Sequence, residues 1–421
     1  MFACIGSYRS LSGDSKASTA GCIGGYRSRV DWVDQVDASR NPFNAGFGVT
    51  PPFLAGRAGL LHRVLANLHD GPGRAAYLSV LLGGRGVGKT VMLNEIRDHV
   101  TDEFGWATIR WTAGPDVPIG TVVADAFDDT IRALRGRRSR VTGGSAGINL
   151  GVVRGEVEVA QDQTRPSTLS AQLRGLGQIA ASVNRQVVLL VDELQACDPS
   201  SLRLLSVALQ ETNGERLPVG LVAAGLPSTS ARLRSIAGAT FLERQRTLPV
   251  SNLSLADARE ALETPIRESG RAYDDGIFEA MLAVSGGYPY AIQLVGEATW
   301  DAAGGRGRIT TAHARRGAAR ARAELDALYG GRWAQLGDQQ RRYLVAVVTL
   351  LGVDGTALSN AVAAALGRET TEVSWLRDSL IKDHQLLYAD GRNALRVALP
   401  GFDVWLRRKL SDPGGPVGGL L

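Results

Sequence analysis

The stretch of residues 76–90, AYLSVLLGGRGVGKT, limits the possible folds of this chain more than any other segment. Its first half is short and apolar, which is typical of a buried strand. Its second half has the pattern G-x-x-x-x-G-K-[ST], and the residues from Val91 onward predict a helix. A strand, a glycine-rich turn and a helix in this order predict a phosphate-binding loop. The alternative is a flexible glycine loop that only precedes a helix.

The residue types of this loop suit a bound polyphosphate. Glycines lack a Cβ atom, so backbone N–H groups can approach an anion at the start of a helix. A lysine in this position neutralises charge on the β- and γ-phosphates, and the hydroxyl after it is a ligand for Mg²⁺. We therefore predict that ATP and Mg²⁺ bind at Gly83, Gly84, Arg85, Gly86, Val87, Gly88, Lys89, Thr90 and Val91.

Two adjacent carboxylates, Asp192 and Glu193, follow a second apolar run at residues 187–191. Ligands of α/β sheets bind at the carboxyl ends of the strands. Asp192 is suited to hold Mg²⁺ through water, and Glu193 is suited to act as the general base toward the attacking water. Alone, such a pair often just ends a strand. Downstream of a phosphate-binding loop, the pair predicts the second half of an ATP site.

The pattern along the chain predicts an α/β P-loop NTPase with a parallel sheet and helices on both faces. Apolar segments that alternate with helical patterns predict further strands at residues 106–111, 219–224 and near Thr240–Leu242. Alternation around glycines predicts a β-hairpin inserted near residues 143–160. From Ser254 onward the strand signals stop and helical patterns begin.

These patterns predict five parts. Residues 1–40 form a disordered tail with a short repeat around Cys4 and Cys22, 41–253 the ATPase core, 254–336 an all-α lid, 337–411 a winged helix, and 412–421 a disordered tail. The three cysteines of the chain favour a reducing compartment. The N-terminus has no signal-peptide pattern, and no apolar run is long enough to span a membrane. We expect a cytoplasmic protein without membrane contact.

Several motifs together resemble those of AAA+-type P-loop ATPases. They are FLAGR at 53–57, GGRGVGKT, VVLLVDE, FLER at 241–244 and the helical lid. The chain most resembles the origin-recognition-like and STAND ATPases, which add a winged helix, and the resemblance covers about Asn41–Leu410. It implies that Phe53 and Arg57 lie near the adenine. It also implies that Arg244 reaches the γ-phosphate of a neighbouring copy, so that Lys89, Glu193 and Arg244 are the catalytic residues.

The sequence departs from this family pattern at two points. No asparagine stands at the end of the strand 219–224, where many AAA+ proteins place a polar sensor, although Ser228 or Thr229 could substitute. The turn 285–290, SGGYPY, resembles the Gly-x-Pro turn of STAND ATPases and has no sensor arginine nearby. Nucleotide sensing through lid packing around Pro289 is the expectation, and a plain helix–helix turn is the alternative.

The leading functional interpretation is an ATP-hydrolysing molecular switch that acts on duplex DNA through the winged helix. Two alternatives remain open. One is a STAND-like signalling ATPase, in which the winged helix packs on the ATPase core as an internal brake and serves protein contacts. The other is a helper ATPase that loads a partner protein. A nucleotide-dependent homo-oligomer is compatible with each.

The DNA-contacting helix is predicted to start after a cap at Thr370 and to run to Lys382, with Arg377, Lys382 and the wing residue Arg392 as contacts. The charge is nearly balanced, because residues 337–411 carry ten basic and eight acidic side chains. Phosphate contacts dominate DNA affinity, so this segment could make only a few. The helix that carries Arg315–Arg322 is the alternative DNA surface.

Overall fold

A parallel sheet forms the centre of the computed structural model, which describes residues 40–46, 48, 50–51, 53–136, 168–304, 307–391 and 393–411. Within these residues the sheet has five strands in the order β2-β3-β4-β1-β5, and every pairing is parallel. The strands are β1 (Leu78–Leu82), β2 (Ala107–Thr112), β3 (Val187–Asp192), β4 (Val219–Gly225) and β5 (Arg246–Pro249). This sheet confirms the predicted α/β fold class.

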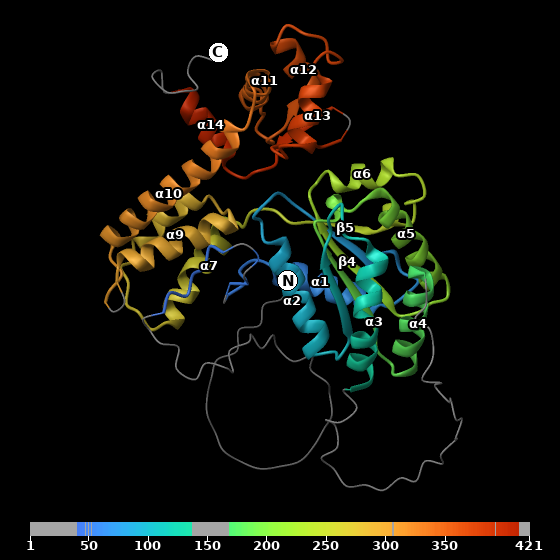
Figure 1. Cartoon of the computed structure of the whole chain (residues 1–421). Helices are drawn as coiled ribbons and strands as arrows, with labels where there is room; N and C mark the ends of the chain where they lie inside the picture. Colours follow the sequence, from blue (N-terminus) through green and yellow to red (C-terminus); the bar gives the residue numbers. More distant parts are fainter. Residues whose placement is uncertain are drawn as a thin grey trace, which may run out of the picture. The chain divides into compact units, whose positions relative to one another are not determined.

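Helices cover both faces of the sheet (Figure 1). Alternate residues of a strand point to opposite faces, so a strand that is buried on both sides is apolar throughout. In β3, Val187, Leu189 and Val191 pack into one core, and Val188 and Leu190 into the other. The first core includes α3 (Ile119–Gly136), α4 (Leu169–Ser182) and α5 (Pro199–Gly214), and the second includes α1 (Ala58–His69) and α2 (Lys89–Asp102).

The expected strand near Thr240–Leu242 is wrong. That segment leads into the 3₁₀ turn η5 (Leu242–Arg244), and the chain forms β5 only afterwards. The physical reason is that β5 pairs with β1 alone, at the edge of the sheet, and buries a single side chain, Leu248. Leu242 is apolar because it is a buried residue of this turn, and not because it belongs to a strand. The short helix α6 (Thr229–Ser235) precedes this turn, and the predicted hairpin at 143–160 lies outside the described residues.

The helical region, residues 255–334, follows the sheet. Its helices are α7 (Leu255–Glu268), α8 (Ile277–Ser285), α9 (Pro289–Ala302) and α10 (Thr311–Ala334), where helical patterns were expected. The segment 41–45 runs along α9. Phe43 is buried against Gly296, where an added Cβ would lie 2.4 Å from the phenyl ring. The backbone N–H of Ala45 donates to Glu297 Oε2 at 2.9 Å, which pins this segment to the helix.

The C-terminal module, residues 338–410, combines helices with a small antiparallel sheet in which β8 lies between β6 and β7. Its elements are α11 (Asp338–Thr349), β6 (Ala357–Leu358), α12 (Ser359–Ala365), α13 (Ser374–Lys382), β7 (Leu387–Ala389), β8 (Ala394–Val397) and α14 (Phe402–Leu410). Helix α13 starts four residues after Thr370, so the predicted cap is wrong. The Glu372 carboxylate instead accepts the Glu369 N–H at 2.8 Å and stabilises a turn.

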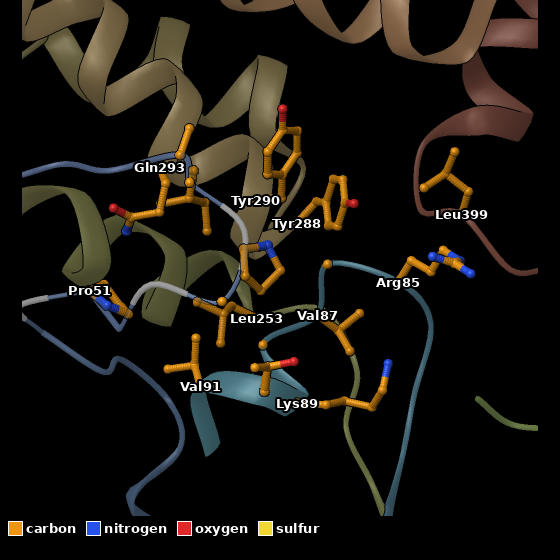
Figure 2. Close-up of a pocket in the computed structure, with 18 of the residues that line it drawn as sticks. Pro51, Arg85, Val87, Lys89, Val91, Leu253, Tyr288, Tyr290, Gln293 and Leu399 are labelled. Atoms are coloured by element: carbon orange, nitrogen blue, oxygen red, sulfur yellow. The ribbon is translucent and has the colours of Figure 1, made fainter. Parts of the chain in front are cut away.

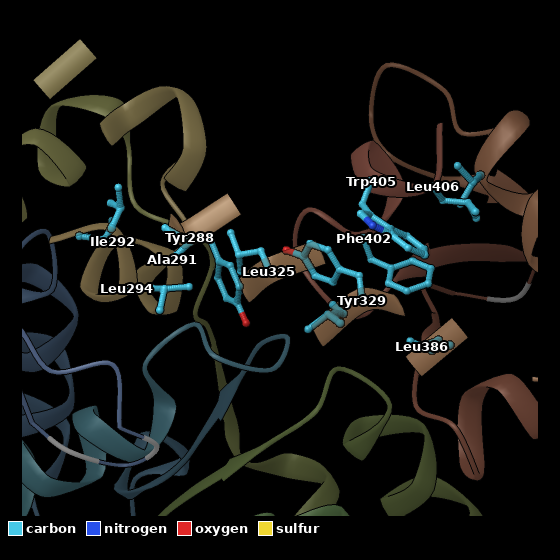
Figure 3. Close-up of a cluster of buried hydrophobic side chains, with 14 of the residues drawn as sticks. Tyr288, Ala291, Ile292, Leu294, Leu325, Tyr329, Leu386, Phe402, Trp405 and Leu406 are labelled. Carbon is cyan, nitrogen blue, oxygen red and sulfur yellow. The ribbon is translucent and has the colours of Figure 1, made fainter. Parts of the chain in front are cut away.

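Helix α14 was not expected from the sequence, and it anchors the module to α10. Phe402 and Trp405 pack around Tyr329, with the Tyr329 and Phe402 ring centroids 5.8 Å apart (Figure 3). The Tyr329 hydroxyl donates to Pro400 O at 2.8 Å, so this buried polar atom is satisfied. The helical region and the module therefore share one continuous apolar core.

In the described part of the chain, no helix combines the length and the apolar character that crossing a membrane requires.

Candidate functional site

The loop Gly83–Thr90 joins β1 to α2 and has a backbone that only glycine fits at several points. Gly86 and Gly88 adopt positive φ angles of 71° and 93°. A Cβ on Gly83 would lie 2.1 Å from the carbonyl oxygen of Val250. The pattern of glycines therefore reflects close backbone approach and left-handed turns, as the sequence predicted for a phosphate-binding loop.

The Lys89 side chain folds back into this loop. Its Nζ donates to Gly83 O at 3.0 Å and to Gly84 O at 2.7 Å, and the residue is only 6% exposed. Burial lowers the pKa of Lys89, because the charged ammonium loses solvation, while Glu193 and Asp192 act in the opposite direction. A phosphate bound in the loop would supply the negative charge that this buried ammonium needs.

The predicted metal ligands Thr90 and Asp192 are in direct contact. Thr90 Oγ1 donates to Asp192 Oδ2 at 2.7 Å, and the backbone N–H of Glu193 donates to Asp192 Oδ1 at 2.9 Å. Hydroxyl and carboxylate oxygens are ligands that Mg²⁺ prefers, with substrate phosphates completing the shell. The described residues contain no cluster of three or more His, Cys, Asp or Glu side chains suited to a metal. This donor pair fits a metal that is held jointly by protein, water and phosphate.

Gln195 is a member of the site that sequence reasoning missed. Its Nε2 donates to Glu193 Oε2, and its Oε1 accepts the backbone N–H of Leu226 at 3.0 Å. Thr229 Oγ1 lies 3.5 Å from the same Oε1, whereas among the described residues Ser228 forms no side-chain hydrogen bond with this group. The only signal in the sequence was a polar residue two positions after Glu193.

A cavity of about 490 Å³ brings the predicted residues together. The loop residues from Arg85 to Val91, Asp192 and Glu193 line it, and Phe53, Arg57 and Pro289 line it as well. Figure 2 shows Lys89 and Val87 facing Tyr288, Tyr290 and Gln293 of the helical region across this space. Arg57 is only 8% exposed and donates to Val87 O at 3.1 Å, so it also supports the loop itself.

Comparison with known proteins agrees with this geometry. Residues 54–222, which include the loop and both carboxylates, match the family model of the AAA ATPase domain. Residues 54–222 are thus similar to an AAA ATPase domain. Residues 326–406 match a domain of unknown function, DUF8462. No curated protein sequence matches the chain.

Two solved structures share the fold of this chain. The Walker-type ATPase PABY2304 of Pyrococcus abyssi is 16% identical, with 84% of this chain and 96% of that chain covered and a TM-score of 0.53. The ADP form of the ORC2 protein of Aeropyrum pernix is 14% identical, with 87% and 98% covered and a TM-score of 0.53. The chain thus has the fold of origin-recognition-like AAA+ P-loop ATPases.

The helical region and the C-terminal module both reach the phosphate-binding loop. Lid packing around Pro289 was the expectation from the sequence, and packing of the module on the core was one of the alternatives. A Cβ on Gly86 would lie 2.2 Å from the Tyr288 hydroxyl, and one on Gly84 would lie 2.6 Å from Ala398 O. Arg85 donates to Gln385 Oε1. His384, Gln385, Leu386 and Leu399 of the module also line the cavity. These contacts join residues about 200 to 300 positions apart, so no local pattern identifies the individual partners.

Arg244, the remaining residue that was predicted to be catalytic, does not join the others. It lies at the end of η5 with an exposed side chain, and it is absent from the lining of the cavity. It precedes β5 and does not follow the last strand, which corrects its expected place in the fold. Arg244 therefore does not border the cavity of its own chain.

Proposed function

We propose that the chain binds Mg-ATP at residues 83–90, hydrolyses it, and works as an ATP-dependent switch. The observation that carries this proposal is that Lys89, Thr90, Asp192 and Glu193 line one cavity beside a loop shaped by glycines. The ORC2 protein of Aeropyrum pernix, of the same fold with a TM-score of 0.51, has been solved as ADPNP–ADP complexes, which supports nucleotide as the ligand.

Each residue then has a defined part in hydrolysis. The loop N–H groups and Lys89 bind the β- and γ-phosphates. Thr90 and Asp192 would hold Mg²⁺, which would neutralise phosphate charge. Glu193 accepts a proton from the attacking water while the oxygen of that water bonds to the γ-phosphorus. The bond between the γ-phosphorus and the oxygen that stays with ADP breaks at the same time. The products are ADP and inorganic phosphate.

We further propose that the C-terminal module is a winged helix that contacts duplex DNA through α13. The charges on this helix are partly cancelled, because Asp378 pairs with Arg377 at 3.0 Å and with Lys382 at 2.9 Å. The third proposed contact, Arg392, lies outside the described residues. Asp378 is therefore the residue that limits how much positive charge α13 presents.

Removal of this carboxylate gives a test of the DNA surface. Asp378→Asn should tighten the binding of labelled duplex and steepen the dependence on salt by about 2 units, because two cations become available to phosphates. Asp383→Asn is the matched control, since it changes the net charge equally at an exposed position for which the described residues show no ion pair. Equal effects of the two variants, or no duplex binding at any salt concentration, would exclude α13. Binding that depends instead on Arg315 or Arg322 would place the surface on α10.

A specific observation favours a second function, the internal brake of a STAND-like signalling ATPase. The C-terminal module touches the phosphate-binding loop at Gly84 and Arg85 and lines the same cavity. A module in this position would hinder exchange of a bound nucleotide until it moves. On this proposal, ATP favours the arrangement in which the module has left the loop.

Gln385→Gly tests the brake directly. Gln385 has a φ of 52°, so glycine removes the Arg85 partner while it suits the backbone. A hydrogen bond to a charged group contributes about 1.5–3 kcal/mol, so release of a fluorescent ADP analogue should accelerate roughly tenfold or more. Asn184→Gly, which relieves a φ of 53° in the turn between α4 and β3, is the matched control and should release ADP at the wild-type rate. An unchanged rate in Gln385→Gly would argue against a brake at this contact.

Arg244 takes part in the proposed hydrolysis only if copies of the chain form a homo-oligomer. Arg244 is exposed and does not line the cavity of its own chain, so the target proposed for it is the nucleotide of a neighbouring copy. A nucleotide-dependent homo-oligomer would bring the two together, and loading of a partner protein remains an alternative use of the same switch.

A further inference from the structure

We infer that Gln195 is a positioning residue for hydrolysis, which ties the carboxylate of Glu193 to the carboxyl end of β4. This inference rests on the proposed function, because it assumes that Glu193 is the general base. It assigns a role to a side chain that neither the phosphate-binding loop nor the acidic pair of β3 includes. Three features of the described residues support it.

The first feature is the orientation of the Gln195 amide. Its Oε1 accepts the backbone N–H of Leu226 at 3.0 Å and lies 3.5 Å from the hydroxyl of Thr229. Both neighbours can donate, so the amide oxygen faces β4 and α6, and the amide NH₂ faces Glu193. An amide held in this way presents its NH₂ group to Glu193. Gln195 is therefore the donor and the Glu193 carboxylate the acceptor in this contact.

The second feature is the space that β4 provides for this amide. A Cβ on Gly225 would lie 3.1 Å from Gln195 Oε1 and 2.3 Å from Thr229 Oγ1. The φ of Gly225 is not positive, so its backbone conformation does not require glycine. Glycine is needed here because a Cβ atom would have no room. Leu226 offers only its backbone N–H at the position where many AAA+ proteins carry a polar side chain. The amide of Gln195, which follows the end of β3, lies at the end of β4 and supplies a polar group there.

The third feature is the backbone at Glu193. Its φ of 53° is left-handed, which is uncommon for a residue with a side chain and is often found at functional sites. The 3₁₀ turn η4 (Leu194–Ala196) follows, closed by the Ala196 N–H donating to Glu193 O at 2.7 Å. This turn brings Gln195 back beside the carboxylate. Gln195 contacts Oε2, which leaves Oε1 to accept the proton of the water.

The test removes the NH₂ donor of Gln195 without changing the size of the side chain. In Gln195→Glu, one carboxylate oxygen can still accept from Leu226, but the other faces Glu193 and repels it. We expect kcat for ATP hydrolysis to fall roughly tenfold to a hundredfold, with the Kd for a non-hydrolysable ATP analogue unchanged. Gln195→Met, which has similar length and no donor, should lower kcat in the same way. Gln210→Glu adds the same charge at an exposed position of α5 and should leave both constants unchanged.

A double variant separates positioning from a general structural effect. If Gln195 acts through Glu193, then Gln195→Glu should cause no further loss in a Glu193→Gln background. Additive losses, weaker binding of the analogue, or wild-type kcat in Gln195→Glu and Gln195→Met would each overturn the inference. A wild-type protein that hydrolyses no ATP would instead refute the proposed function, so the two failures are distinguishable.

Discussion

Lys89→Ala is expected to weaken the binding of Mg-ATP by about a hundredfold or more. The ammonium lies inside the loop, where it donates to Gly83 O and Gly84 O. Removal of a buried charge from a charge-assisted contact costs about 2–5 kcal/mol, and each 1.4 kcal/mol is tenfold in affinity. Equilibrium titration with a fluorescent ATP analogue measures this loss.

The control for this variant is Lys382→Ala. Its side chain is 70% exposed and lies outside the residues that line the cavity, so ATP affinity should not change. The circular dichroism spectrum and thermal unfolding of Lys89→Ala should be recorded as well, because the two loop carbonyls lose their donor. A folded Lys89→Ala protein with wild-type affinity would show that the nucleotide binds elsewhere.

Glu193→Gln is expected to keep ATP binding and lose turnover. Glutamine has the same shape but cannot accept a proton from water, and a general base contributes roughly 10²–10⁴-fold to a rate. The measurement is single-turnover release of phosphate at saturating Mg-ATP, together with the Kd. Glu243→Gln, at an exposed position in η5, is the matched control with wild-type turnover expected. Full turnover by Glu193→Gln would remove Glu193 from its role as base.

The fold of the sheet could be predicted because its strands are locally distinctive. β3 is apolar from Val187 to Val191, and its two faces pack into two separate cores, so burial itself produced the pattern. β5 could not be found in this way. It lies at the edge, buries only Leu248, and carries Arg246 and Thr247 on its exposed positions. The neighbouring buried turn residue Leu242 gave a stronger apolar signal than the strand.

The sequence predicted those residues of the candidate site that lie close together along the chain. The glycines, Lys89 and Thr90 follow from one loop, and Asp192 and Glu193 from one strand end. Gln195 lies two residues from Glu193, but it reaches its second partner, the N–H of Leu226, only when β4 lies beside β3. The contact of Arg85 with Gln385 joins residues 300 positions apart. Nothing local distinguishes these glutamines from solvated ones. Tertiary packing, and not residue type, places them at the loop.

The most direct measurement of the central claim is steady-state phosphate release by the full chain with ATP, with Mg²⁺ present or removed by EDTA. The loop, Thr90 and Asp192 form one site, so hydrolysis should require both ATP and Mg²⁺ and should vanish in Lys89→Ala protein purified in parallel. Lys89→Ala also serves as the control for a contaminating ATPase. Phosphate release that is absent in the wild type, that persists in EDTA, or that is equal in the Lys89→Ala protein would contradict the account.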